Sequence, residues 1–340
     1  MIMIAKICKK SMRYNKYKIR IMSEQFESRL EKPEALRGAL QEVFDRCGLG
    51  CVAEYTLVDV GFEDYNVIVV NEVGQRYFVK VLAKSRTYEE IARYASIIEA
   101  AIAAGVNHPP MYRDEQGSLR IDTASMSMFV MDVVDGRTFY ESETVPNDEQ
   151  LKKIMDQVVK ISRIPLVPTY EYDGWAIPNI REMHRKVSSH IDQDAKPYID
   201  EALRQYESLS VAELPTCFVH GDLTKANIIA GNDGNIYIID FSVANIYPRI
   251  QELVVVATSL MSGSGNELPI RERLQKLANL YIAAGGELSE LERESMFPYA
   301  LAGFAMEYLG ALNEQVTHGD SDEIYHWKEL GIKGLKEALQ

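Results

Sequence analysis

Two acidic residues and one asparagine have types and spacing suited to phosphate chemistry. Asp222 lies two residues after a histidine, Asn227 follows Asp222 by five residues, and Asp240 ends an apolar run thirteen residues later. Transfer of a phosphoryl group requires a hydroxyl held in line with the phosphate, metal ions that neutralise charge, and a carboxylate that accepts the hydroxyl proton. We therefore predict that Asp222 is the base and that Asn227 and Asp240 are oxygen ligands of Mg²⁺.

The spacing as a whole carries more weight than any one residue. A Gly-Asp pair is common in turns, so Asp222 alone could simply cap the segment that follows it. The offsets of Asp, Asn and Asp, separated by an apolar hairpin with a turn at 232–235, match those of protein-kinase catalytic and metal-binding loops. Gly221 is a departure, because protein kinases carry Arg there, and no Ala-Pro-Glu segment follows Asp240. Both differences favour a small molecule over a protein as the acceptor.

Two neighbours of these residues have structural alternatives. His220 is interpreted as a hydrogen-bonding residue that braces the loop, because its position is the bracing position in kinases. Lys225 could contact the γ-phosphate or face solvent. The other histidines show no metal-ligand spacing with one another.

A lysine in the middle of an apolar strand gives a second candidate site. Lys80 stands between two valines, where a buried ammonium is costly unless it meets an anion. We predict that Lys80 reaches the α- and β-phosphates of a nucleotide; the alternative is an edge-strand lysine that points to solvent. The turn at 59–66 has the thinnest signal, since it holds a single glycine, but Gly61 and Asn66 are predicted to cover the nucleotide.

The elements that must position these residues divide into a sheet part and a helical part. Short runs rich in β-branched and aromatic residues predict strands at 55–60, 66–70, 77–82, 119–121 and 127–134. Apolar residues at helical spacing predict helices at 36–47, 87–102, 150–162, 181–192, 200–208, 271–284, 289–312 and 322–339. The predicted fold class is α+β, a bilobal protein-kinase-like fold with a small antiparallel-sheet N-lobe and a larger helical C-lobe. The predicted domains are a flexible or mis-started segment at 1–31, a nucleotide-binding lobe at 32–134, and a catalytic and substrate-binding lobe at 135–340.

Composition and charge narrow the class of partner. Of the 37 basic residues, seven fall in the first 21 positions, which hold no acid, so residues 22–340 carry 30 basic against 50 acidic residues. Such acidity repels nucleic acid and suits a cationic small substrate, although it could serve solubility alone.

No apolar stretch approaches the roughly 20 residues that cross a bilayer, and four scattered cysteines are too few for a disulfide framework. We expect a cytoplasmic monomer or homodimer without nucleic-acid or membrane partners.

The basic start of the chain has two interpretations. It lacks the continuous apolar core of a secretory signal, and it could be a targeting arm. Met22, followed by Ser-Glu-Gln, looks equally like the true translation start.

Three motifs together resemble the aminoglycoside phosphotransferase superfamily, which includes choline, homoserine, methylthioribose and fructosamine kinases. They are Gly61-Phe62-Glu63-Asp64-Tyr65-Asn66, His220-Gly221-Asp222 with Asn227, and Ile239-Asp240-Phe241. The resemblance covers about residues 50–340, and its first turn is most similar to bacterial homoserine kinases. It implies ATP, or alternatively GTP, as the donor, Mg²⁺ as the metal, and a substrate pocket in the helical lobe. It also implies that the strand through Met131 and Val133 offers backbone hydrogen bonds to adenine.

One departure from the family concerns the partner of Lys80. Relatives usually present a Glu on the helix after the lysine strand, but this chain has Tyr94 at the expected place. Glu90, one turn earlier on the same face, is predicted to pair with Lys80 instead, although its spacing from Thr87 also suits a capping box. Glu99 projects from a different face. The missing Glu leaves open a nucleotide-binding pseudokinase that acts as a scaffold.

The predicted function is transfer of the γ-phosphate of ATP to a hydroxyl of a small molecule. An amino-sugar of the aminoglycoside-antibiotic type is the first candidate, because the body is acidic and this is the family's commonest substrate label. Homoserine or another metabolite is the rival, and Ser242, where choline kinases generally carry an acid, counts against choline. Glu307 and Asp320 are predicted to contact a cationic substrate, although the aromatic residues near Glu307 are most simply core.

Overall fold

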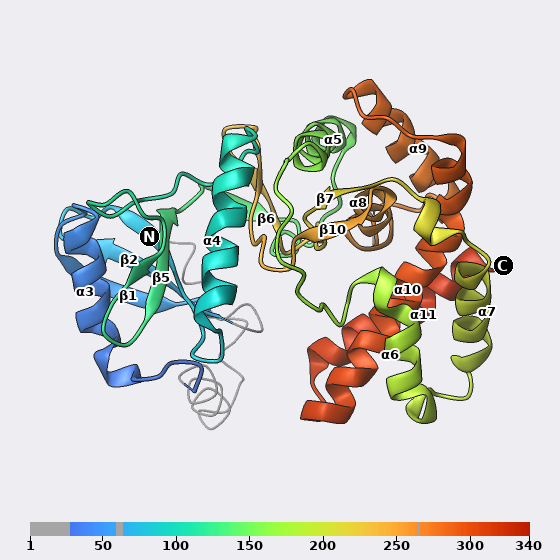
Figure 1. The fold of residues 1–340 in the computed structure, drawn as a ribbon, viewed down its shortest axis with the longest axis horizontal. Coiled ribbons are helices and arrows are strands. Elements are labelled where there is room, and N and C mark those ends of the chain that lie inside the picture. Colours follow the sequence, from blue (N-terminus) through green and yellow to red (C-terminus); the bar gives the residue numbers. More distant parts are fainter. Residues whose placement is uncertain (1–27, 59–63, 264) are drawn as a thin grey trace. The chain divides into compact units, whose positions relative to one another are not determined.

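The computed structural model describes residues 28–58, 64–263 and 265–340, and it divides into two compact units (Figure 1). The first unit runs to Ala95 and also includes Pro109–Val133; the second consists of Ser96–His108 and Val134–Gln340. Most of the predicted N-terminal segment, including the candidate start Met22, lies outside the described residues. No helix in the described ranges is long and apolar enough to span a bilayer.

The boundary between the units differs from the predicted one at residues 96–108, which were expected in the N-lobe. The side chain of Asn107 donates to the backbone oxygen of Ile236 at 2.6 Å, and its backbone nitrogen donates to Gln157 at 2.7 Å. The backbone nitrogen of Ile238 donates in turn to the backbone oxygen of Asn107 at 2.9 Å. These bonds attach the segment to elements of the second unit.

The first unit is built on a five-stranded antiparallel sheet in the order β1-β2-β3-β5-β4. Its strands are β1 (Val52–Leu57), β2 (Tyr65–Asn71), β3 (Arg76–Val81), β4 (Ile121–Asp122) and β5 (Ser127–Asp132). Its helices are α3 (Leu36–Arg46) and the first half of α4 (Tyr88–Ala103). The predicted strands are confirmed in number and order, while their ends shift by a few residues.

One face of this sheet packs on α3. Leu40, Val43 and Phe44 of α3 are fully buried in one cluster with the alternate strand residues Val67 and Val79. Side chains along a strand point alternately to opposite faces. The even-numbered residues of β3, including Lys80, therefore face away from α3.

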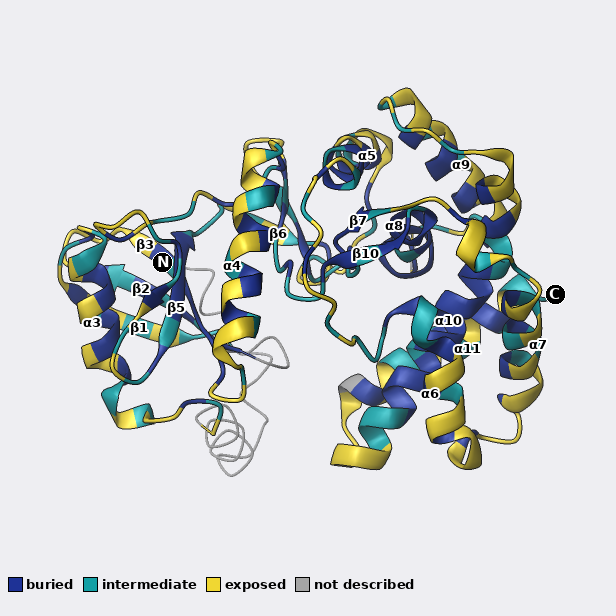
Figure 2. Ribbon diagram, in the orientation of Figure 1, coloured by how far each residue is buried: buried dark blue, intermediate teal, exposed yellow. Residues whose placement is uncertain are grey.

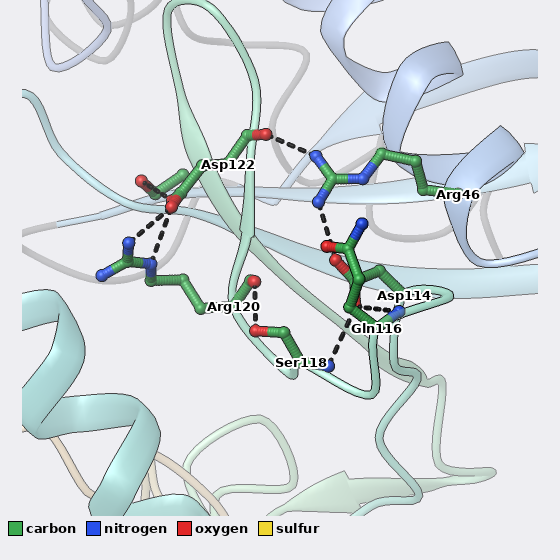
Figure 3. A network of polar contacts seen from close by, with 7 residues as sticks. Arg46, Asp114, Gln116, Ser118, Arg120 and Asp122 are labelled. Carbon is green, nitrogen blue, oxygen red and sulfur yellow. Dashed lines mark hydrogen bonds and ion pairs between the residues drawn. The ribbon is translucent and has the colours of Figure 1, made fainter.

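A polar network fixes the edge of the sheet to the end of α3 (Figure 3). Arg46, the last residue of α3, donates to the backbone oxygen of Asp122 at 2.5 Å and to the carboxylate of Asp114 at 2.7 Å. The same carboxylate accepts hydrogen bonds from the backbone nitrogens of Gln116 and Ser118. This network holds the turn before β4, and hence the β4–β5 edge beside β3.

The second unit is mainly helical. Its helices are α5 (Asp148–Ser162), α6 (Ile180–Val187), α7 (Lys196–Glu207), α8 (Ile250–Val255), α9 (Ile270–Ala283), α10 (Glu290–His318) and α11 (Asp322–Ala338). Helix α10 is central and packs on α6, α7, α8 and α11, and Figure 2 shows α8 and much of α10 as buried. A Cβ added at Gly331 of α11 would lie 2.5 Å from the backbone oxygen of Phe304, so the close approach of α11 and α10 requires glycine there.

Helix α8 was missed by the sequence reasoning. It continues into a π-helical segment at Val256–Leu260, and nearly every residue of the two is buried. A helix that is buried all round has no polar face, so its apolar residues show no helical period. The run of valines at 254–256 favours a strand by propensity.

Two small sheets lie among these helices. Strand β7 (Thr216–Val219) pairs with β10 (Asn245–Pro248), and β8 (Ile228–Gly231) lies between β6 (Gly136–Thr138) and β9 (Ile236–Ile238). The predicted hairpin with its turn at 232–235 is present as β8–β9. These strands hold both ends of the segments that carry Asp222 and Asp240.

Candidate active site

Lys80 lies in the interior of the first unit, in the central strand of the sheet. The strand register places it opposite Asn66 of β2 and Phe129 of β5, and only 6% of Lys80 is exposed. The alternative of an edge-strand lysine that points to solvent is therefore wrong. Burial of an ammonium requires anionic or polar partners.

Asp64 supplies the anionic partner. Its Oδ2 lies 3.4 Å from Nζ of Lys80, and its carboxylate also accepts from Nε of Arg86 at 2.8 Å and Nη2 at 3.0 Å. Nζ of Lys80 further donates to the hydroxyl of Tyr94 at 3.1 Å. Tyr94, which stands where the family resemblance implies a Glu, therefore belongs to the same polar cluster as Lys80 and Asp64.

The predicted pairing of Glu90 with Lys80 is corrected by these contacts. The carboxylate of Glu90 accepts from the backbone nitrogen of Thr87 at 2.6 Å, and the hydroxyl of Thr87 accepts from the backbone nitrogen of Glu90. These two bonds form the capping box at the start of α4, which is the alternative role considered for Glu90. The first backbone amides of a helix lack partners within the helix, and the capping box supplies acceptors for them.

Three of the remaining nucleotide-site candidates, Asn66, Met131 and Val133, lie in the sheet of the first unit or at its border. Gly61 lies outside the described residues. Asn66 stands beside Lys80 on β2. Met131 is buried near the end of β5, and Val133 is the last residue of the first unit.

In the second unit, His220 joins two segments of the loop region. Its Nδ1 accepts from the backbone nitrogen of Asp222 at 3.2 Å, and its Nε2 donates to the backbone oxygen of Ile239 at 3.0 Å. Its ring packs on Phe241 with centroids 4.4 Å apart. Burial lowers the pKa of His220 to about 4, so the ring is neutral at physiological pH. These contacts match the predicted bracing role.

The backbone conformation of Gly221 explains why this chain has glycine where protein kinases have Arg. Its φ is +88°, and a Cβ there would lie 3.3 Å from the backbone oxygen of Val243. An L-residue in this region of φ is strained, so the turn favours glycine. The backbone nitrogen of Gly221 donates to Oε1 of Glu252 at 2.8 Å.

Glu252 anchors this turn from the first residues of α8. It is 1% exposed, and burial raises its pKa to about 7. Arg249, the residue directly before α8, donates two hydrogen bonds to the fully buried carboxylate of Glu292, at 2.9 and 2.7 Å. This pair fixes the start of α8 to the start of α10.

The structure brings Asp222, Asn227 and Asp240 into one region of the second unit. Nδ2 of Asn227 donates to Oδ2 of Asp222 at 2.6 Å and to its backbone oxygen at 3.0 Å. Burial, and then the charge of Asp240, raise the pKa of Asp222 well above its ordinary value. Asp240 has a φ of +64°, which is rare for a residue other than glycine. Such strained conformations concentrate at functional sites.

Two further carboxylates lie close enough to influence Asp222. The charges of Asp173 and Glu307 also raise the pKa of Asp222, and burial followed by the charge of Asp173 raises the pKa of Glu307 to about 7. Asp320 is separate, because it follows α10, whose end at His318 lies about 16 Å along the helix axis from Glu307. Asp320 is engaged by the exposed side chain of Gln315 at 2.7 Å. The structure therefore does not bring Asp320 to the site of Glu307.

The donor set fits a magnesium ion. Asp240 and Asn227 offer a carboxylate and an amide oxygen, which are the kinds of ligand that Mg²⁺ prefers. Within the described ranges no group of three or more His, Cys, Asp and Glu residues forms a complete metal cage. Mg²⁺ in phosphotransferases is commonly held by one or two carboxylates together with phosphates and water, so this sparse set is suitable.

Sequence comparison decides the family. A profile of the phosphotransferase enzyme family matches residues 54–291, more than half of the chain. This chain belongs to that family. The predicted membership of the aminoglycoside phosphotransferase superfamily and the predicted phosphotransferase activity are confirmed. No curated protein sequence shows significant similarity to the phosphotransferase.

Solved structures with low sequence identity share the fold of the phosphotransferase. A spectinomycin phosphotransferase bound to ADP and spectinomycin has 15% identity and a TM-score of 0.64, over 88% of this chain and 97% of that chain. An amicoumacin kinase bound to AMP-PNP and Ca²⁺ has 14% identity and a TM-score of 0.61, over 90% and 96%. A choline kinase from Streptococcus pneumoniae has 14% identity and a TM-score of 0.59, over 88% and 99%. The predicted kinase-like fold class is therefore confirmed.

Sequence reasoning missed the roles of Asp64 and Asp173. Asp64 was quoted within the first motif, but nothing in its spacing pointed to Lys80 across a strand pairing. Asp173 lies in a loop, 49 residues before Asp222, and has no motif around it. Only the fold brings its charge near Asp222 and Glu307.

Proposed function

We propose that this phosphotransferase moves the γ-phosphate of ATP to a hydroxyl of a small cationic molecule, with an amino-sugar as the first candidate acceptor. The observation that carries the proposal is the setting of Asp222. This half-buried carboxylate lies within the electrostatic influence of three other carboxylates, Asp240, Asp173 and Glu307. Such a group of acids favours the arrival of positive charge.

Each residue has a defined part in the proposal. Lys80 binds nucleotide phosphates. Asn227 and Asp240 would hold Mg²⁺, whose positive charge would offset that of a phosphate group. Asp222 orients the acceptor hydroxyl and takes its proton. Burial, and then the charges of neighbouring carboxylates, raise the pKa of Asp222, so cations that offset those charges favour its ionised, proton-accepting form. Activity is thereby coupled to binding of both metal and substrate.

The acceptor amine is assigned to Asp173 and Glu307. Both are carboxylates whose charges influence Asp222, and neither is among the residues assigned to the metal, Asn227 and Asp240. The solved structures support a small-molecule acceptor, since their ligands or names include spectinomycin, amicoumacin and choline. The donor is taken as ATP, with GTP as the alternative, because the bound nucleotides are ADP and AMP-PNP.

The pseudokinase alternative loses its main support. It rested on the missing Glu at Tyr94, but Lys80 has a carboxylate partner in Asp64 and a hydroxyl partner in Tyr94. Homoserine remains the enzymatic rival, because it also carries an ammonium and a hydroxyl.

A coupled assay of ADP release tests the proposal. The protein is supplied with Mg²⁺ and either ATP or GTP, and aminoglycosides, homoserine, choline and methylthioribose are compared as acceptors. We expect ADP release that depends on a cationic hydroxyl compound and falls by about 10³-fold or more in Asp222→Asn. Unchanged release in Asp222→Asn would show that the assigned base is wrong. Nucleotide binding without transfer to any acceptor would support a pseudokinase instead.

A further inference from the structure

Asp64 lies between two buried cations in the first unit. Its carboxylate lies 3.4 Å from Nζ of Lys80 and accepts hydrogen bonds from both Nε and Nη2 of Arg86. Its Oδ1 also accepts from the backbone nitrogen of Ala83 at 3.1 Å. Asp64 is 4% exposed and the side chain of Arg86 9% exposed. The forked bonds and the backbone bond fix the carboxylate in one orientation.

Tyr94 completes the surroundings of Lys80. Its hydroxyl accepts from Nζ of Lys80, and its ring lies 5.1 Å from Nζ and 5.8 Å from the guanidinium carbon of Arg86. The ring packs edge-to-face on Phe129 at 5.2 Å. Both cations therefore contact an aromatic face that is itself held by the sheet.

We propose that Asp64 is the positioning residue for Lys80, in place of the helix-borne Glu that the family resemblance implies. This inference rests on the proposed role of Lys80 in binding nucleotide phosphates. Glu90 is unsuited to the task, since its carboxylate caps the start of α4. Arg86 orients Asp64, and Tyr94 adds a neutral acceptor where relatives have a carboxylate.

The arrangement has a physical consequence for phosphate binding. Asp64, Lys80 and Arg86 together carry one net positive charge, so Lys80 keeps the ability to attract an anion while it is held in place. The carboxylate belongs to the residue directly before β2, and the amide of Ala83 follows β3. The position of Lys80 therefore depends on two adjacent strands of one sheet and on a fixed arginine.

The test compares four single variants for ATP affinity, measured by calorimetry without acceptor, and for the KM values of ATP and acceptor. Lys80→Met and Asp64→Asn should each weaken ATP binding about tenfold or more, as expected for loss of a charge-assisted contact. Tyr94→Phe should weaken it about threefold, because only one hydroxyl is lost. Glu90→Gln is the matched control and should leave ATP affinity unchanged. The KM of the acceptor should stay within about threefold of the wild-type value in all four.

A reconstruction separates positioning from general damage. In Asp64→Asn with Tyr94→Glu, a carboxylate returns beside Nζ of Lys80 from the position of the tyrosine hydroxyl, and ATP affinity should recover to within about threefold of wild type. Thermal unfolding of each variant shows whether it is folded. If Asp64→Asn does not fold, Tyr94→Phe carries the test of the Lys80 contacts.

Different outcomes overturn different statements. Normal ATP affinity in folded Asp64→Asn, with weak affinity in Lys80→Met, would contradict the positioning role and leave the proposed function intact. Normal ATP affinity in Lys80→Met would contradict the proposed role of Lys80 itself. A loss in Asp64→Asn that Tyr94→Glu does not restore would show that the carboxylate does not act by positioning Lys80.

Discussion

The backbone nitrogen of Gly221 donates a hydrogen bond of 2.8 Å to Oε1 of Glu252, which ties the 220–227 loop to helix α8. Helix α8 is in turn fixed by the pair of Arg249 and Glu292. The loop that carries Asp222 thus depends on a buried carboxylate 30 residues further along the chain.

Glu252→Gln should change how stability depends on pH. Glutamine keeps an acceptor for Gly221 but does not ionise. The folded pKa of Glu252 is about 7, above its value in the unfolded chain, so its contribution to stability falls as pH rises from about 4.5 through 7. From pH 6 to pH 8 the wild type should lose about 1 kcal/mol more than the variant, measured by urea unfolding. Parallel pH curves would contradict the raised pKa.

Gly221→Ala should lower both stability and turnover. A positive φ costs an L-residue about 1–2 kcal/mol, and the new Cβ also meets the backbone oxygen of Val243 at 3.3 Å. Because the strain lies beside Asp222, we expect kcat to fall about tenfold or more. Gly319→Ala is the matched control, since Gly319 has the same φ of +88° with nothing within 4 Å of its Cβ. Equal losses of kcat in the two variants would argue against a specific effect on the loop.

His220→Gln should reduce the acid sensitivity of the fold. The folded pKa of His220 is about 4, below the unfolded value near 6.5, so its contribution to stability is complete above pH 6.5 and is lost as pH falls towards 4. Between pH 7 and pH 5 the wild type should lose about 2 kcal/mol more than the variant in urea unfolding. His318→Gln, at an exposed histidine, serves as the control for the substitution itself. A variant curve parallel to the wild type would contradict a neutral, buried His220.

The sequence could predict the parts of the site that depend on local spacing. Asp222, Asn227 and Asp240 lie together because a short hairpin joins them, and hairpin and spacing are both visible in the sequence. Lys80 was recognised because an ammonium between two valines needs a partner. The partner itself was predicted wrongly, since Glu90 satisfies the start of its own helix and Asp64 reaches Lys80 across the β2–β3 pairing.

The features that could not be predicted from the sequence depend on contacts between distant segments. Asp173 and Glu307 influence one another although 134 residues separate them, and no periodicity links them. Helix α8 is buried on all sides and therefore gave no amphipathic pattern. Asp320 was grouped with Glu307 by charge and sequence proximity, but helical rise carries the two apart.

Glu307→Gln should weaken binding of the cationic acceptor and remove its pH dependence near neutrality. A cation binds the ionised carboxylate, and the pKa of Glu307 is about 7, so affinity of the wild type should rise about tenfold between pH 6 and pH 8. Calorimetry with an amino-sugar or another accepted amine, without nucleotide, measures this separately from proton transfer by Asp222. Asp320→Asn is the matched control, because Asp320 follows the end of the same helix, α10, and should leave affinity unchanged. A loss in Asp320→Asn with none in Glu307→Gln would place the amine at the end of α10 and reject the Asp173–Glu307 assignment.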